Sequence, residues 1–253
     1  MRGVAWLVVV AGCGRVNFEP LANASQDGTT NPTIDAAVAG LIHHWPVDEL
    51  PGELVAHDIV GGADATMTNP ASFDTTIKQV GAASLASNAG GFAYVPIPAD
   101  LVGKTQLTMS AWFKRSAPSA VEQLGQEIAA QNVTNNRELS IQYWTDGLVY
   151  ACVGDTGPCG KAVNDDTSWH LTQLVFDGSQ PDDATRLVLY VDRVQQVLSF
   201  SGPPAVPAST PSVLGNHFDL GAVSDNETQD TGWIDDVRIY DHALSAAEIA
   251  LIP

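Results

Sequence analysis

The sequence is poor in basic residues. It contains 11 Lys and Arg against 29 Asp and Glu, which gives a formal net charge of −18 over 253 residues. Proteins that bind nucleic acid neutralise phosphates with clusters of lysine and arginine. Because the chain has no such cluster, the sequence argues against a nucleic-acid partner.

Long apolar runs are also scarce. Residues 4–11 form a short apolar run behind Arg2, too short to span a bilayer but typical of a signal peptide, which we assign to residues 1–12. The run ends Val-Ala-Gly-Cys13, which resembles the processing site of bacterial lipoproteins. The resemblance implies cleavage before Cys13, lipidation of its thiol, and anchoring in the outer membrane of a Gram-negative bacterium through the lipid alone. The alternative is an ordinary secretory signal followed by an accidental cysteine.

The stretch after this cysteine has no apolar periodicity. Residues 15–40 are rich in Asn, Ser, Asp, Gly and Thr, so we interpret residues 13–40 as a lipidated N-terminus and a disordered tether. The remainder, residues 41–253, is long for a typical domain but ordinary for one large β-sandwich.

Apolar and polar residues alternate with a period of two along many short segments of this remainder, which predicts strands. The clearest segments are residues 105–114, 139–144, 148–153, 169–178, 187–192 and 232–240. Near the end, Ser245 precedes Glu248 by three residues, a capping box that predicts a short helical turn. Many strands and one terminal turn predict an antiparallel sandwich or barrel.

Several of these segments carry a family pattern. The terminal stretch Ile-Asp-Asp-Val-Arg-Ile-Tyr-Asp-His-Ala-Leu-Ser-Ala-Ala-Glu-Ile over residues 234–249 closely resembles the last motif of laminin-G-like, concanavalin-A-like jelly-roll domains of bacterial surface proteins. Residues 41–49, 65–69 and the pair of strands at 169–178 and 187–192 are similar to further motifs of that family. The resemblance covers about residues 41–252 and implies an all-β, antiparallel, two-sheet jelly-roll sandwich with a short C-terminal helical turn.

Family members often hold one structural calcium ion, and the resemblance implies a site for it. The matching positions are Asp48, Asp58, Asp64 and Asp235. The alternation of the last strand also predicts that Asp235 shares a face with Val237 and Ile239, and a charge facing a core needs a partner, usually a cation. The alternative is that loop amides satisfy this carboxylate.

Cys152 and Cys159 enclose Val-Gly-Asp-Thr-Gly-Pro, a sequence that favours a turn. In an exported protein two cysteines this close predict a disulfide, with free thiols or half of a zinc site as alternatives. His43 and His44 are adjacent on the first predicted strand, so they point to opposite faces and cannot chelate one ion together.

Sequence motifs of catalysis are missing. Concanavalin-A-like glucanases carry a Glu-x-Asp-x-Glu cluster on one strand, whereas the nearest pairs here, Glu49/Glu53 and Glu122/Glu127, lack the intervening Asp. There is no Gly-x-Ser-x-Gly, no His-Glu-x-x-His and no phosphate loop. The sequence therefore predicts that the chain is not an enzyme.

The six tryptophans bear on what the chain binds, because sugars stack on aromatic faces. Most of them lie within the strand motifs, where packing explains them, but Trp144 shares the polar register of its strand with Gln142. Trp144 is therefore the candidate ligand-binding residue. The leading hypothesis is a membrane-tethered module that binds a carbohydrate or a glycosylated ligand. A structural or adhesive envelope protein with a protein partner is the alternative, and an unusual glycoside hydrolase is the third hypothesis.

Overall fold

The computed structural model describes residues 38–88, 91–96, 98–118, 120–127, 137–155, 159–200, 206–211, 217–221 and 232–253. The predicted signal peptide, Cys13 and most of the predicted tether lie outside these ranges. No helix within the described ranges is long and apolar enough to cross a membrane.

The described strands form two antiparallel sheets. In the first sheet the order is β14 (Val194–Gln195), β13 (Leu187–Val191), β12 (His170–Asp177), β7 (Gln106–Arg115), β17 (Gly232–Tyr240), β5 (Ser84–Ala86) and β4 (Ser72–Asp74), and β1 (Leu41–Trp45) also pairs with β17.

In the second sheet the order is β15 (Ser199–Phe200), β11 (Gly160–Val163), β10 (Leu148–Asp155), β9 (Arg137–Tyr143), β8 (Glu122–Glu127), β16 (His217–Gly221), β6 (Phe92–Pro96), β3 (Ala65–Met67) and β2 (Val55–Ala56). Within the described ranges, short helices join or follow the strands: η2 (Ala99–Leu101), α2 (Asp183–Arg186) and α3 (Ala246–Ile249).

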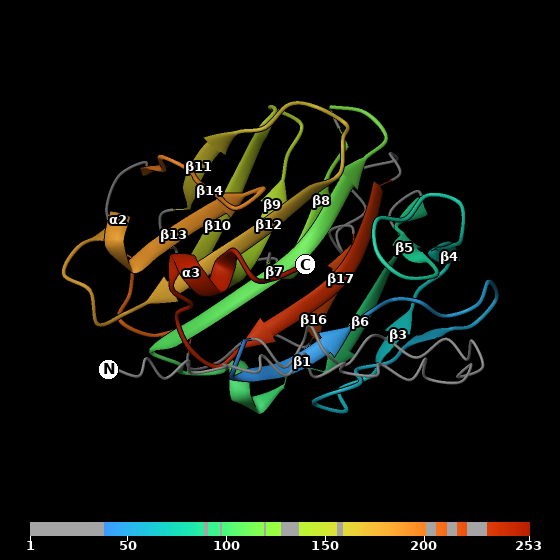
Figure 1. The fold of residues 1–253 in the computed structure, drawn as a ribbon, viewed down its shortest axis with the longest axis horizontal. Helices are drawn as coiled ribbons and strands as arrows, with labels where there is room; N and C mark the ends of the chain where they lie inside the picture. Colours follow the sequence, from blue (N-terminus) through green and yellow to red (C-terminus); the bar gives the residue numbers. More distant parts are fainter. Residues whose placement is uncertain are drawn as a thin grey trace, which may run out of the picture.

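The two sheets stack face to face, as Figure 1 shows. One hydrophobic core lies between them, and the alternate residues of β7 predicted to share a face, Leu107, Met109, Ala111 and Phe113, all lie in it. The predicted class, an all-β antiparallel two-sheet sandwich of jelly-roll type with a C-terminal helical turn, is therefore confirmed.

The outer face of the first sheet is covered by the end of the chain. The predicted capping box is present: Ser245 Oγ accepts the N–H of Glu248, and the Glu248 carboxylate accepts the N–H of Ser245. This cap starts α3, which lies in front of the first sheet in Figure 1. Ile249 and Leu244 pack there against Val175 of β12 and against Val38, the first described residue. The two ends of the described chain therefore meet on this face.

The last strand departs from strict alternation. Its register with β7 shifts between Asp235 and Arg238, and Asp236 adopts a left-handed φ of 51°. This bulge inserts one extra residue, so Ile234 joins Val237 in the core and Asp235 turns away from it. The prediction that Asp235 shares a face with Val237 and Ile239 is therefore wrong, although Asp235 is fully buried.

A carboxyl group lies inside the sandwich. Glu122 of β8 points inward, is wholly buried, and accepts a hydrogen bond from Ser87 Oγ. A Cβ at Gly232 would collide with the Glu122 side chain, so glycine at the start of β17 makes room for it. Burial raises the pKa of Glu122 to about 8, although the Ser87 hydrogen bond and the charge of Arg115 oppose this shift. The group is therefore neutral at neutral pH.

Candidate functional site

Two of the four predicted calcium ligands converge on the loop between β4 and β5. Asp235 Oδ2 accepts hydrogen bonds from the N–H groups of Gln79 and Val80 at 2.8 and 2.9 Å. Asp48 Oδ1 accepts the N–H groups of residues 82–83, the latter at 3.0 Å. One loop thus wraps around a carboxylate from the bulge of β17 and another from the segment after β1.

This pair of carboxylates has unmet bonding capacity. Asp235 Oδ1 is buried and finds no hydrogen-bond partner among the described residues. Burial raises the pKa of Asp235 to about 8; the two loop amides lower it, and the charges of Asp236 and Asp48 raise it. Converging carboxylate oxygens inside a loop are the ligands that calcium prefers, so Asp48 and Asp235 fit a cation site in part.

Backbone geometry points the two carboxylates toward the loop. Val47, directly before Asp48, and Asp236, directly after Asp235, both adopt left-handed φ values, 55° and 51°. A β-branched residue rarely tolerates this region, so the surrounding structure must hold Val47 there. Gly81 lies between the two pairs of amides, and a Cβ on it would stand 2.2 Å from the Asp48 carboxylate.

Asp58 and Asp64 do not join this pair. Asp58 accepts the N–H groups of His44, Val60, Gly61 and Ala63 at 2.9–3.1 Å and contacts His43 Nδ1 at 2.6 Å. Burial alone would raise its pKa, but these bonds hold it far below its ordinary value. Asp64 accepts the Asp58 N–H and contacts His57 Nδ1 at 3.0 Å. In the described part of the chain, no group of three or more His, Cys, Asp or Glu is placed to hold a metal ion.

The adjacent histidines serve the same end of the sandwich. Both are buried, and they point to opposite faces as predicted, because His43 pairs with the core residue Ile239 and His44 with Arg238. His43 bridges Asp58 and Asp100 through its two ring nitrogens, at 2.6 and 3.1 Å. Burial lowers the pKa of His43, but the two carboxylates outweigh it and the net shift is upward. His44 instead contacts Asp236 at 2.8 Å, so the two histidines contact different carboxylates.

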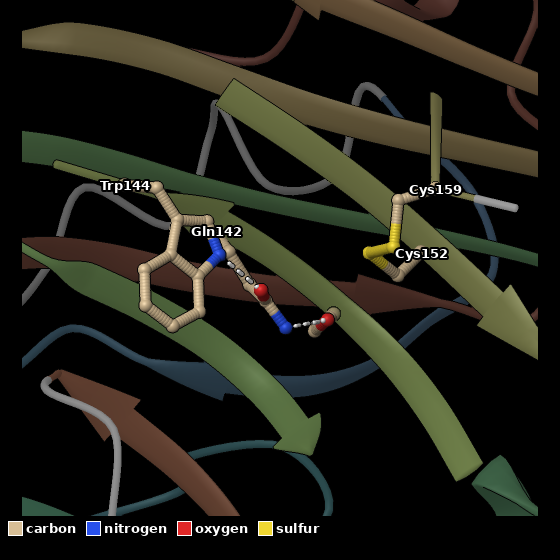
Figure 2. The surroundings of a disulfide bond; sticks show 5 residues. Gln142, Trp144, Cys152 and Cys159 are labelled. Atoms are coloured by element: carbon tan, nitrogen blue, oxygen red, sulfur yellow. Dashed lines mark hydrogen bonds between the residues drawn. A yellow bond between two sulfur atoms is a disulfide. The ribbon is translucent and has the colours of Figure 1, made fainter. Parts of the chain in front are cut away.

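Trp144 lies at the end of β9, on the outer face of the second sheet. Leu124, Ile141 and Val149 of β8, β9 and β10 point into the core, so their strand neighbours point outward. The indole N–H of Trp144 donates to Gln142 Oε1 at 2.6 Å, a contact drawn in Figure 2. The Gln142 amide in turn donates to Ser140 Oγ at 2.8 Å. Trp144 is half-buried, and its N–H is used within the protein, so the ring face is what it can offer to a ligand.

The middle of this outer face is closed. Gln123, Ser140 and Gln142 are buried although they point away from the core. Half-buried aromatic rings lie on either side of them, Trp144 and Tyr150 at one end and Tyr94 at the other. A ligand of this face would therefore meet the aromatic ends rather than the amide groups between them.

Arg115 holds the loops beside Trp144, and the sequence alone did not single it out. It is 2% exposed, and its guanidinium donates to the carbonyl oxygens of Pro118, Trp144, Asn164 and Asp166 at 2.7–3.2 Å. It also lies over the ring of Tyr143, 5.2 Å from the centroid. No sequence pattern marks such a residue, because its partners are backbone groups of three separate loops.

The predicted disulfide between Cys152 and Cys159 is present and lies on the neighbouring strand pair in Figure 2, with the Cα atoms 4.3 Å apart. It ties β10 to β11, because Ala151 pairs with Gly160 in the next register position.

Replacing both cysteines by serine is expected to lower the free energy of unfolding by about 2–3 kcal/mol, because the open chain regains the entropy of a short closed loop. Urea unfolding of the oxidised protein, the reduced protein and the double variant measures this. The reduced wild type should match the variant. Equal stability of all three forms would contradict the prediction.

A family model described as the concanavalin A-like lectin/glucanases superfamily matches residues 89–250. A search of curated protein sequences finds no match. Among solved structures, Trypanosoma rangeli sialidase in complex with sialic acid is 17% identical with a TM-score of 0.56, covering 84% of this chain and 32% of the sialidase. The chain thus spans about a third of the length of that enzyme.

Two further structures are similar. Domain 4 of AbnA, a GH43 extracellular arabinanase from Geobacillus stearothermophilus, in complex with arabinotriose, is 15% identical with a TM-score of 0.55, covering 85% of this chain and all of the domain. The receptor-binding domain of botulinum neurotoxin mosaic serotype C/D is 12% identical with a TM-score of 0.53, covering 83% of this chain and 49% of that one. At these identities the likenesses show the fold alone.

These likenesses correct the prediction that the chain is not an enzyme. The similar structures include a sialidase and a domain of an arabinanase, both glycoside hydrolases, so a missing Glu-x-Asp-x-Glu cluster does not separate this chain from such enzymes. The described residues also include Asp219, which lies buried on the outer face of the second sheet. Burial raises its pKa to about 6, with His217 opposing the shift, and a carboxyl in this range can donate a proton near neutral pH.

Proposed function

The chain belongs to the concanavalin A-like lectin/glucanase superfamily, and from that premise we propose that it binds a carbohydrate on the outer face of its second sheet. The observation that carries the proposal is the half-buried Trp144, whose ring lies on a sheet face and whose polar N–H is already bonded to Gln142. Aromatic rings fixed in this way offer the apolar faces on which sugar rings stack. Sugar complexes of similar structures support the choice of ligand.

A glycan array probed with the purified protein tests this function, with and without calcium. Trp144→Ala is expected to weaken binding about tenfold, the order of one aromatic contact. Trp112→Phe is the matched control, because Trp112 lies on the first sheet and its indole donates to the Pro253 carbonyl. Binding to an unglycosylated protein without any glycan response would contradict the proposal and favour an adhesive envelope protein.

We also propose that the chain is exported and held at the membrane by lipid on Cys13. Radiolabelled palmitate should enter the wild type and not Cys13→Ser. Equal labelling of both proteins would contradict the anchor.

A calcium ion held by Asp48, Asp235 and carbonyl groups of their loop is a further part of the proposal. Extracellular modules bind calcium with dissociation constants of about 10⁻⁴–10⁻³ M. At about 10 mM calcium the expected gain in unfolding free energy is then roughly 1.4–2.7 kcal/mol, or about 3–10 °C in melting temperature. Thermal scans with calcium and with chelator measure this gain.

The variants for this test follow from the contacts. Asp235→Asn should remove most of the calcium response. Asp64→Asn should keep it, because Asp64 bonds the Asp58 amide and His57 instead. Identical melting curves of the wild type with calcium and with chelator would mean that the protein itself satisfies Asp235.

A further inference from the structure

Three rings gather on the outer face of the second sheet at β6 and β16. The rings of Phe92 and Tyr94 on β6 and the imidazole of His217 on β16 have centroids 5.6–6.3 Å apart. We call these three residues the aromatic platform. All three are half-buried, and they stand on paired strands, so their positions are set by the sheet ladder rather than by a loop. The proposed function leaves this platform without a role.

A buried carboxyl group, that of Asp219, contacts the imidazole of the platform. His217 Nδ1 lies 2.6 Å from Asp219 Oδ1, two residues along the same strand and therefore on the same face. The Asp219 side chain is 3% exposed, whereas that of His217 is 34% exposed. An ionised carboxylate only accepts hydrogen bonds, so Nδ1 carries the proton and Nε2 is the ring nitrogen left for a ligand.

We propose that the aromatic platform binds a neutral sugar ring, which stacks on Tyr94 and bonds through a hydroxyl to His217 Nε2, with Asp219 as the positioning residue. The inference rests on the proposed glycan binding and adds a second contact region, distinct from Trp144. Tyr94 and Trp144 lie on strands separated by β16 and β8, so one sugar ring cannot touch both.

Charge selects the class of sugar. The chain has a net charge of −18, and the side chain beneath the platform is a carboxyl. A described cation of this face, Lys161, lies on β11 near the other end and sits 5.1 Å over the ring of Tyr150. An acidic sugar at the platform would meet repulsion from the Asp219 carboxylate and from the net negative charge of the chain. Neutral oligosaccharides, of the kind represented by arabinotriose, therefore fit the platform better than sialylated ones.

Nuclear magnetic resonance of the full chain tests this inference, with arabinotriose and sialyllactose as the two probes. Arabinotriose is expected to shift the His217 imidazole signals, and sialyllactose to shift them less at equal concentration. Tyr94→Ala should weaken arabinotriose binding about tenfold, while Tyr94→Phe, which keeps the ring, should retain most of it. Asp219→Asn should change the ¹⁵N signals that report the His217 tautomer and lower the affinity. Tyr190→Ala, on the first sheet, is the control for loss of a tyrosine.

Each outcome separates the platform from the proposed function. Binding that Trp144→Ala abolishes and Tyr94→Ala leaves unchanged would overturn the platform and keep the proposed function. Absence of binding to every glycan would overturn both. A stronger response to sialyllactose than to arabinotriose would overturn the neutral class. Unchanged His217 nitrogen signals in Asp219→Asn would remove the positioning role of Asp219.

Discussion

Replacing Arg115 by alanine is expected to lower the free energy of unfolding by about 3–5 kcal/mol. The side chain is almost fully buried and donates four hydrogen bonds, each to a backbone carbonyl. Hydrogen bonds from a charged donor stabilise more than neutral ones, and truncation removes one donor from each carbonyl group; among the described residues only that of Trp144 keeps a second, the N–H of Gly147. Denaturant unfolding of the wild type and of Arg115→Ala measures the loss.

The arrangement around Arg115 explains why lysine should not rescue it. The four carbonyl groups come from the loops after β7, β9 and β11, and the two terminal nitrogens of the guanidinium each reach two of them. An ammonium group is a single point and cannot span these positions. We therefore expect Arg115→Lys to recover less than half of the lost stability.

Arg193→Ala is the matched control for this experiment. Arg193 is exposed and donates to one carbonyl, that of Ile252, at 2.6 Å. Its loss should lower the free energy of unfolding by about 1 kcal/mol or less. Arg115→Ala should also change the fluorescence of Trp144, whose carbonyl oxygen Arg115 binds. An equal loss of unfolding free energy in Arg115→Ala and Arg193→Ala would show that the burial of Arg115 adds nothing to its contribution.

Local pattern was enough to predict most of the strands. Alternation placed one face of β7 in the core, and the spacing of Ser245 and Glu248 predicted the cap of α3, because both signals depend only on nearby residues. The short spacing of Cys152 and Cys159 likewise predicted their disulfide. These are the features in which sequence distance and spatial distance coincide.

Features that depend on distant partners were missed or misplaced. The bulge at Asp236 reversed the face of Asp235, and no alternation pattern announces a bulge. The burial of both adjacent histidines was not predicted, because the loop carrying Asp58 and the bulged strand each supply a partner to one of them. His217 and Asp219, by contrast, could have been found, since a spacing of two on a strand puts both on one face.

The site was less predictable than the fold for the same reason. Family motifs marked four aspartates for calcium, but only Asp48 and Asp235 meet at one loop. Asp58 and Asp64 instead bind amides of their own loop and the nearby histidines His43 and His57. A motif match does not show which backbone N–H groups donate to each carboxylate in the fold. The exclusion of enzymatic activity failed because it rested on absent sequence motifs, whereas hydrolases share this fold.

The pH dependence of stability should be dominated by carboxyl groups that the fold keeps neutral. Glu122 has an ordinary pKa of 4.5 and a folded-state pKa of about 8, raised mainly by burial. Below pH 4.5 it is protonated in both states, so its contribution to stability is fully present. Between the two values the unfolded state releases the proton and the folded state retains it, so the free energy of unfolding falls by about 1.4 kcal/mol per pH unit. Above the folded pKa the loss levels off.

Glu122→Gln is expected to remove this contribution. At pH 5 the variant should be about 1–2 kcal/mol less stable than the wild type. The amide nitrogen would bring two buried N–H donors to the position of Glu122 Oε2, which has no hydrogen-bond partner among the described residues. As the pH rises to 8 the wild type should lose about 3–5 kcal/mol through Glu122 and the variant none, so the two stability curves should cross. Urea unfolding of both proteins at intervals between pH 4.5 and 9 measures the difference.

The difference between the two proteins is the decisive quantity, because other groups titrate in the same sense. Burial also raises the pKa of Asp219 to about 6 and that of Asp235 to about 8, so the wild type should be more stable at pH 5 than at pH 8 even apart from Glu122. Glu53→Gln, on the exposed loop before β2, is the surface control and should run parallel to the wild type. If Glu122→Gln also runs parallel to it at every pH, then Glu122 is ionised inside the fold, and a buried anion rather than a neutral acid faces Ser87 across the core.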